Sequence, residues 1–207
     1  LGKLPRVKER VSNCQKWRMQ SPKTGDAYKL KDTPHLFRPC KQFKNESYIA
    51  IPLVSSSNRK YMPMGFIDDG MIPGNNLFSV FGANFYHFGV LTSNVHMAWI
   101  RAVGGQLKSD WRYSKDIVYN NFPWPTPTEA QRAKIEKTAQ AILDARAKYP
   151  TCSLADLYDE TVMPPELRTA HQQNDRAVME AYGFWGKLNS EPECVAELMK
   201  MYQELTK

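Results

Sequence analysis

The spacing of apolar residues along the chain changes near residue 127. Before that point, short β-rich runs such as 48–54 and 61–67 alternate with polar turns. Runs of this kind predict strands, and these two predict a hairpin whose prolines lie at strand ends or edges. Beyond residue 127, apolar residues recur with the helical period. The pattern therefore predicts a mixed α/β part followed by an all-α part.

One helix is predicted inside the first part, over residues 95–103. Ser93 or Asn94 can cap its start, and Gly104 with Gly105 ends it. The apolar residues of this segment recur at helical spacing and form a single stripe: Val95, Ala98, Trp99, Ala102 and Val103.

Three helices are predicted after residue 127. Thr128 with Gln131, and Ser190 with Glu193, match the capping box that marks helix starts. Pro165 predicts the start of the helix between them, because proline is favoured in the first turn.

A proline-rich segment at 122–127 separates the two parts. Its three prolines can continue neither a helix nor a central strand, so an extended connector is predicted. The predicted organisation is a first domain over 1–127 and a second over 128–207. The predicted fold class is α+β, with a basic mixed α/β domain followed by a small all-α helical domain.

The charge of the chain is divided along the same boundary. Residues 1–127 carry 18 Lys and Arg against 8 Asp and Glu, whereas residues 128–207 carry 10 against 13. The first 44 residues alone hold 12 basic and 3 acidic side chains. This division favours a basic part that meets a polyanion. An ordinary solvated basic face remains the alternative, and composition does not decide between them.

Several classes of protein are disfavoured by what the sequence lacks. No apolar run approaches the roughly 18 residues of a membrane-spanning helix, and residues 1–5 carry no signal-peptide core. The chain begins without an initiator Met, as expected of a processed or excised chain. The cysteines lie far apart with no C-x-x-C pair, which indicates a reduced, cytoplasmic protein: Cys14, Cys40, Cys152 and Cys194.

A search for catalytic motifs finds none. Phosphate-loop, dinucleotide-binding, zinc-protease and serine-hydrolase patterns are all missing, and the four histidines show no ligand spacing. His87 and His96 are therefore interpreted as structural histidines, and Asp68 with Asp69 as a solvated turn rather than a metal site. Residues 120–123 (NNFP) differ in order from the N-P-P-[FY] motif of adenine methyltransferases. No catalytic, cofactor-binding or metal residue is predicted.

The segment 106–114 carries the most informative pattern. If it is extended, Leu107, Trp111 and Tyr113 lie on one face, while the other face carries Lys108, Asp110 and Arg112. Such a row of donor, acceptor and donor suits the base edges of a major groove, because Lys or Arg donates to guanine and Asp accepts from cytosine. A surface strand with local salt bridges remains the alternative.

Four further cations lie on or beside predicted turns. They could contact phosphates and fix register without reading sequence: Arg59, Lys60, Arg101 and Lys115. Each could equally be an ordinary exposed cation.

Seven segments of the chain resemble the MmeI-like family of DNA methyltransferases and restriction-modification enzymes (type IIG). In order, they are 88–93 (FGVLTS), 96–101 (HMAWIR), 107–114 (LKSDWRYS), 118–125 (VYNNFPWP), 139–146 (AQAILDAR), 153–159 (SLADLYD) and 163–167 (MPPEL).

The resemblance implies a part of a larger bacterial enzyme. In that family a DNA adenine-N6 methyltransferase, often preceded by a nuclease domain, is followed by a target-recognition domain and a helical C-terminal domain. Residues 1–127 and 128–207 would be these last two domains. The S-adenosylmethionine site would lie upstream, so this chain should hold no cofactor, bind double-stranded DNA, and be inactive alone.

The resemblance also implies roles for three residues. Lys108 and Asp110 match the pair that specifies the base pair next to the methylated adenine, and this pair would select G·C. Arg112 matches a position that reads another base pair, with a partner about thirty residues upstream, near Asn75 or Asn76.

Three hypotheses follow for the function. The leading one is the sequence-specific DNA recognition module of an adenine-N6 methyltransferase. The second gives the chain a catalytic role of its own, against which the missing cofactor motifs argue. The third is a basic adaptor that binds DNA without base readout or binds another protein.

Overall fold

The computed structural model describes residues 4–38, 46–68 and 70–207. The chain divides into two compact units, residues 1–44 and 45–207, which are described separately.

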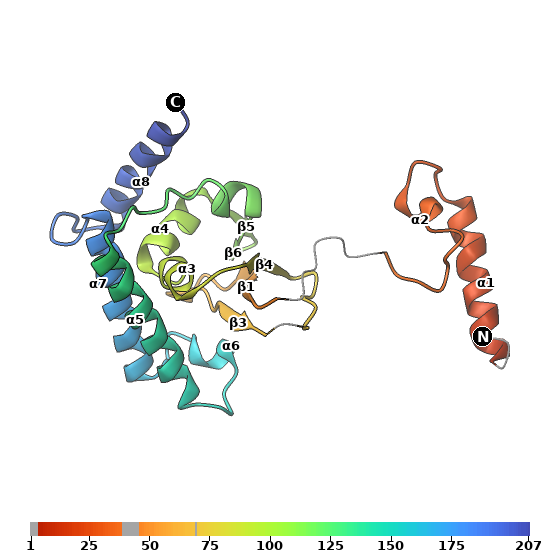
Figure 1. Ribbon diagram of the computed structural model, residues 1–207, viewed down its shortest axis with the longest axis horizontal. Coiled ribbons are helices and arrows are strands. Elements are labelled where there is room, and N and C mark those ends of the chain that lie inside the picture. The colour runs from red at the N-terminus through yellow and green to blue at the C-terminus, as the bar shows by residue number, and fades with distance from the viewer. Residues whose placement is uncertain (1–3, 39–45, 69) are drawn as a thin grey trace. The chain divides into compact units, whose positions relative to one another are not determined.

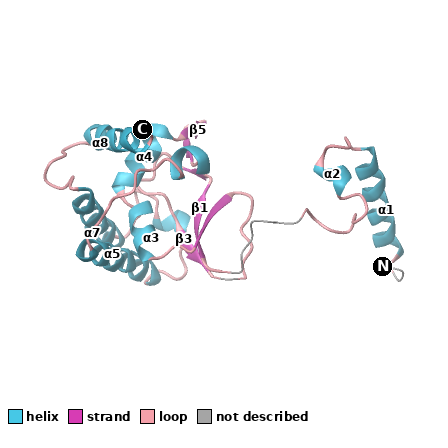
Figure 2. Cartoon of the chain, turned by 45° about the horizontal axis from the view of Figure 1, so that its top comes forward, coloured by secondary structure: helices cyan, strands magenta, loops and turns pink. Residues whose placement is uncertain are grey.

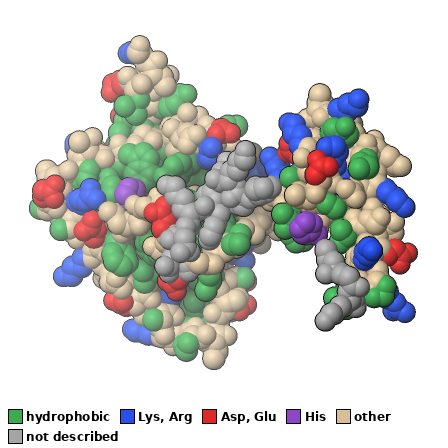
Figure 3. Space-filling model, turned by 45° about the vertical axis from the view of Figure 1, so that its right-hand side comes forward, with side chains coloured by type: hydrophobic (Ala, Val, Ile, Leu, Met, Phe, Trp, Pro, Cys, Tyr) green, Lys and Arg blue, Asp and Glu red, His purple; other side chains and the backbone are tan. Residues whose placement is uncertain are grey.

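The first unit is a small helical hairpin stabilised by one arginine. It contains α1 (Pro5–Gln20) and the short α2 (Asp26–Lys29). The Arg18 guanidinium donates to the carbonyl oxygens of Leu30 (2.7 Å), Thr33 (2.9 Å) and Leu36 (2.9 Å), and so fixes the loop after α2. Figure 3 shows Lys and Arg side chains over the visible face of this unit.

The first unit differs from the sequence prediction, which placed mostly strands and turns before residue 127. Helix α1 was missed because none of its residues is buried, so no apolar stripe marks it. Pro5 in its first turn was the one local signal.

The second unit contains two small antiparallel sheets. One has the strand order β3-β1-β4, formed by β1 (Tyr48–Pro52), β3 (Gly65–Ile67) and β4 (Leu77–Phe81). The other has the order β2-β6-β5, formed by β2 (Val54–Ser55), β5 (Gly105–Leu107) and β6 (Asp110–Arg112). The predicted pairing of runs 48–54 and 61–67 is confirmed for β1 and β3. However, the first run continues into β2, which joins the second sheet.

Helices cover the first sheet (Figures 1 and 2). The β region contains α3 (Phe85–Leu91), α4 (Asn94–Val103) and the π-helical turn η1 (Lys115–Tyr119). The predicted helix at 95–103 is confirmed as α4, with Ser93 as its cap. Helix α3 was not predicted, because five of its seven residues are buried and little polar face remains to reveal a period.

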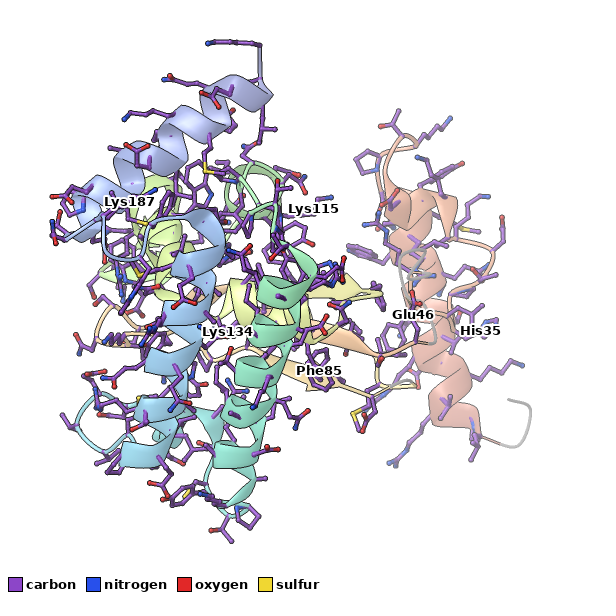
Figure 4. All side chains as sticks on the ribbon, turned by 60° about the vertical axis from the view of Figure 1, so that its left-hand side comes forward. His35, Glu46, Phe85, Lys115, Lys134 and Lys187 are labelled. Carbon is purple, nitrogen blue, oxygen red and sulfur yellow. The ribbon has the colours of Figure 1, made fainter. Side chains whose placement is uncertain are left out.

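The C-terminal part is helical, as predicted. It contains α5 (Glu129–Ala147), α6 (Leu154–Leu157), α7 (Pro165–Tyr182) and α8 (Glu191–Leu205). Helices α5 and α7 lie side by side in Figures 1 and 4. Lys134 of α5, labelled in Figure 4, forms an ion pair with Glu180 of α7. The capping box of α5 is complete, whereas Glu193 of α8 accepts instead from the backbone N–H of Asn189 (2.8 Å).

One hydrophobic core runs through the second unit, across the proline-rich segment at 122–127. The backbone of α3 approaches α5 so closely at Gly89 that a Cβ there would lie 2.6 Å from the Ile135 side chain. The segment 122–127 forms neither helix nor strand, and it is held to the rest of the unit by hydrogen bonds. Tyr182 donates to the carbonyl oxygen of Pro123 (2.8 Å), and Tyr86 to that of Pro125 (3.3 Å).

A buried polar network lies at the junction of α5, α7 and the β1–β3 sheet. Arg146 is 9% exposed, and its guanidinium donates to the Met64 carbonyl oxygen (2.7 Å) and the Tyr158 hydroxyl (2.9 Å). The Tyr158 hydroxyl is also hydrogen-bonded to His171 Nε2 (2.6 Å). Buried polar groups must find partners within the protein, so this network fixes how α5 meets the sheet.

Replacing Thr128 with Ala is expected to lower the free energy of unfolding by about 1 kcal/mol. The Thr128 hydroxyl accepts from the backbone N–H of Gln131, which no carbonyl of the helix reaches. Urea denaturation of both proteins measures the difference. Thr126→Ala, two residues earlier and exposed, is the control. If both variants lose the same free energy of unfolding, the Thr128 cap does not stabilise α5.

His96 is expected to make stability depend on pH. Complete burial lowers the pKa of His96 to about 3, so the native state does not take up a proton that the unfolded state binds below its pKa of 6.5. Stability is therefore lost as the pH falls below 6.5. Between pH 7 and pH 5.5, this group contributes a loss of about 1 kcal/mol.

The measurement compares urea midpoints at both pH values for the wild type and His96→Gln. Burial also lowers the pKa of His171 and raises that of Asp175 to about 6, with opposite effects on stability, so only the difference between variant and wild type isolates His96. His35→Gln, at an exposed position, should keep the wild-type dependence. If His96→Gln also keeps the wild-type pH dependence of stability, the assignment of that dependence to His96 is wrong.

Candidate nucleic-acid interface

The segment 106–114 is a tight hairpin, not the continuous strand that the alternation predicted. Strands β5 and β6 pair with Leu107 opposite Asp110, so Lys108 and Ser109 form a two-residue turn. Lys108 has a φ of 58°, in the left-handed region that favours glycine. Nothing in the sequence marks this turn, because it contains neither Gly nor Asn.

The turn changes which side chains share a face. Residues opposite one another in an antiparallel pair point to the same side of the sheet. Leu107 therefore lies on the face of Asp110 and Arg112, not on that of Trp111 as predicted. Leu107 is 54% exposed, whereas Trp111 packs against the core.

Strand β2 completes a three-stranded sheet with two unlike faces. Ser55 pairs with Trp111 and is buried, so this face points inward. Val54 pairs with Arg112 and lies on the outer face. The outer face thus combines the charges of β6 with two apolar side chains, Val54 and Leu107.

The three residues expected to read bases have no partners within the described part of the chain. There, neither an ion pair nor a side-chain hydrogen bond is formed by Lys108, Asp110 or Arg112. The local salt bridges that the alternative interpretation requires are thus absent among the described residues. Within that part of the chain, the donors and acceptors of the three side chains are unoccupied. Lys108 lies at the tip of the hairpin, and Asp110 and Arg112 lie along β6.

The turn expected to assist Arg112 lies close to the same sheet. The backbone N–H of Leu53 donates to the Asn76 carbonyl oxygen (3.0 Å), and the Leu53 carbonyl accepts from Tyr113 N–H (2.8 Å). Two hydrogen bonds thus connect Asn76 to the residue after Arg112. This proximity supports a shared role, without assigning one to the Asn75 or Asn76 side chain.

The four candidate phosphate contacts differ in whether their charged groups are exposed or already paired within the protein. Arg101 donates to Glu191 Oε2 (2.7 Å) and to the Lys60 carbonyl oxygen (3.1 Å), so its guanidinium connects α4 to α8 and to the turn after β2. Lys60 itself is exposed, with its ammonium 5.5 Å from the Tyr61 ring centroid. Lys115, labelled in Figure 4, is 60% exposed and lies 3.9 Å from Asp116.

Arg59 as a whole is half-buried, whereas its Nε atom is buried and has no hydrogen-bond partner among the described residues. The geometry thus favours Lys60 and Lys115 as exposed phosphate contacts, and gives Arg101 a structural role.

The histidines have structural surroundings. His87 completes the cap of α3 with Asn84, and His96 is fully buried with its Nε2 3.0 Å from the Tyr113 hydroxyl. Among the described residues, no cluster of His, Cys, Asp or Glu has the composition of a metal site. Asp69 and Cys40 lie outside the described residues.

None of the helices in the described part of the chain combines the length and apolar character needed to cross a bilayer.

Comparisons with known proteins agree with this architecture. Residues 1–126 match the family model "MmeI, target recognition domain", and residues 127–207 match "MmeI, C-terminal domain". A curated relative, "DNA methyltransferase A" of Bacillus subtilis (strain 168), is 39% identical over 202 residues, 98% of this chain and 22% of the relative.

A solved structure is also similar. It is that of the type IIL restriction-modification enzyme MmeI in complex with DNA, with a TM-score of 0.87, 42% identity, and coverage of 97% of this chain and 26% of that one. The chain thus spans about a quarter or less of the length of these relatives. It belongs to the MmeI family, in which it corresponds to the target recognition and C-terminal domains.

Proposed function

We propose that this chain is the sequence-reading part of a larger bacterial DNA adenine-N6 methyltransferase. It binds double-stranded DNA and positions an upstream catalytic domain of the same polypeptide on its target site. The observation that carries this proposal is the outer face of the β2-β6-β5 sheet, where Asp110 and Arg112 form no ion pair or side-chain hydrogen bond with the described residues. The relative solved with DNA supports it.

The hairpin suits a major groove, which admits a two-stranded ribbon. Lys108 at the tip donates to guanine O6 or N7, and Asp110 accepts from the N4 amino group of the paired cytosine. Arg112 reads a further base pair, with a contribution from the turn at 75–76. Val54 and Leu107 on the same face offer apolar contact to the methyl group of thymine.

Phosphate contacts set the register of the hairpin without reading sequence. Lys60 and Lys115 are the exposed candidates, with Arg59 beside the first of them. The basic first unit adds attraction for the DNA backbone, which would weaken as salt is raised.

The chemistry itself belongs to the upstream domain. A methyltransferase parent implies S-adenosylmethionine as methyl donor, and this chain offers no recognised motif for it. The expected division is a target-recognition domain over 1–127 and a helical domain over 128–207. Cytoplasmic location is part of the same proposal.

The experiment that tests this function is sequencing of the source genome for methylated adenine, with and without the parent gene. An asymmetric motif in which methyladenine is followed by G supports the Lys108 and Asp110 assignment. A motif in which another base follows the methyladenine would leave the family assignment intact, but would show that Lys108 and Asp110 do not select G·C. If no motif is lost on deletion, the proposed function fails for this gene under the conditions tested.

The alternative is a basic adaptor without base readout. It predicts that added salt weakens binding to all DNA sequences equally, whereas a sequence reader keeps its preference for one site. Competition between specific and random duplexes at two salt concentrations separates the two.

A further inference from the structure

A cavity beside the reading hairpin has no role in the function proposed so far. It lies between the β3-β1-β4 sheet and η1, and its volume is about 320 Å³. Cavities that bind small molecules start at about 300 Å³, so this one accommodates a group of that size. Of the residues discussed above as DNA contacts, only Lys115 lines it.

The walls of the cavity are largely aromatic. Phe78 of β4 and Tyr113 after β6 contribute rings whose centroids lie 6.0 Å apart, and Tyr119 of η1 adds a third ring. The Tyr113 ring is held in place, because its hydroxyl is hydrogen-bonded to the buried His96 (3.0 Å). Tyr113 is only 2% exposed and backs the wall, so the ring surfaces left to a ligand are those of the half-buried Phe78 and Tyr119. Aromatic faces of this kind favour a flat, aromatic ligand.

The rim of the cavity is polar. Lys115 supplies a cation that is 60% exposed, and Asn120 supplies an amide that can both donate and accept. The only side-chain hydrogen bond of Asn120 among the described residues is a long one to Asp116 (3.4 Å). A planar ligand with a polar edge and an attached anion would use all of these groups.

The π-helical turn η1 brings these rim residues together. Its wide hydrogen bonds run from Tyr119 N–H to the Ser114 carbonyl (3.2 Å) and from Asn120 N–H to the Lys115 carbonyl (2.9 Å). The turn is fixed to the core by Trp99, whose indole N–H donates to the Val118 carbonyl (2.9 Å). Isolated π-helical turns occur frequently at functional sites.

We infer that this cavity receives a nucleobase displaced from the bound duplex. The base would stack on the aromatic walls, Asn120 would bond its edge, and Lys115 would contact its phosphate. Tyr113 follows Arg112 directly, so the strand proposed to read the groove leads into the cavity wall. The inference rests on the proposed function and adds a second site to it.

The test uses the full-length enzyme and duplexes that carry a single mismatch at each position in and around its methylation motif. A mismatched base is already partly unpaired, so its capture costs less. We expect one position at which the mismatch strengthens wild-type binding several-fold, and at which Tyr119→Ala and Asn120→Ala abolish that gain. Loss of stacking should also weaken Tyr119→Ala on the matched duplex roughly tenfold.

The controls separate this site from others. Tyr119→Phe keeps the ring and should keep the gain, whereas Lys187→Ala, on an exposed loop, should change nothing. A mismatch at the target adenine can also strengthen binding through the catalytic domain. Such a gain in affinity should persist in both Tyr119→Ala and Asn120→Ala. Asn120 is exposed, so its variant remains informative if Tyr119→Ala fails to fold.

Two results would overturn the inference. One is a mismatch scan in which no gain depends on Tyr119 or Asn120 although the enzyme still prefers its motif. The other is that both variants destabilise the DNA-free enzyme and leave the mismatch pattern unchanged, which would mean that a side chain from elsewhere in the polypeptide fills the cavity. If the wild type shows no sequence preference, the proposed function itself fails.

Discussion

Replacing either Lys108 or Asp110 with Ala in the full-length enzyme should cost about 1–3 kcal/mol of discrimination at one base pair. Each side chain is expected to contact one base of the same G·C pair, and neither has a partner within the described chain whose loss would disturb the fold. Methylation rates on duplexes that vary at each motif position measure the effect. Lys187→Ala, which removes an exposed charge elsewhere, should leave discrimination intact.

Exchanging the cationic donor at position 108 and the anionic acceptor at position 110 gives a stronger test. Lys108→Glu combined with Asp110→Arg should change the preferred base at that position rather than abolish binding, because donor and acceptor change places. Equal weakening on all duplexes would show that these residues do not read bases. Loss of folding in the double variant would instead favour a structural role for the hairpin charges.

Replacing Arg146 with Ala should lower the free energy of unfolding by about 2–4 kcal/mol. The change removes a large buried side chain and leaves the Met64 carbonyl without its donor (2.7 Å). It also takes away the guanidinium that stacks on Phe88, 5.3 Å from the ring centroid. Since small domains are stable by only about 5–15 kcal/mol, the variant should unfold at clearly lower urea concentration.

The matched control is Arg168→Ala. Arg168 pairs with Glu160 (2.6 Å) on the exposed side of α7, so its loss should cost less than about 1 kcal/mol. Arg146→Lys should lie between the two, because the ammonium retains the charge but loses the fork of donors. If Arg146→Ala loses as little unfolding free energy as Arg168→Ala, water must take over the hydrogen bonds of the missing guanidinium.

The helices that could be predicted from sequence are those with one buried and one exposed face. Helix α4 follows from its apolar stripe, and α5 and α7 from their start signals. Helix α3 is nearly all buried and α1 has no fully buried residue, so neither has a clear amphipathic period to detect. The prolines correctly excluded helix and central strand from 122–127, but the hydrogen bonds that hold this segment come from Tyr86 and Tyr182, which lie far away in the sequence.

For the candidate site, the sequence names residues, whose role stays a prediction, but not their geometry. Both the alternation in 106–114 and the resemblance to a family point to Lys108, Asp110 and Arg112, whose chemistry suits base edges. Alternation placed Leu107 on the wrong face because it assumed one continuous strand. A reversal at Lys108 needs a left-handed residue, and sequence reasoning expects Gly or Asn there.

The left-handed backbone of Lys108 has a consequence for directed evolution. A lysine in this conformation is strained by roughly 1 kcal/mol relative to glycine, so Gly and Asn are the residues that thermal stability alone would select. A library at position 108 sorted by heat resistance should therefore be enriched in them. The same library sorted by methylation of a chosen motif should be enriched in long polar side chains. The two enrichments would measure how far stability and target choice compete at a single residue.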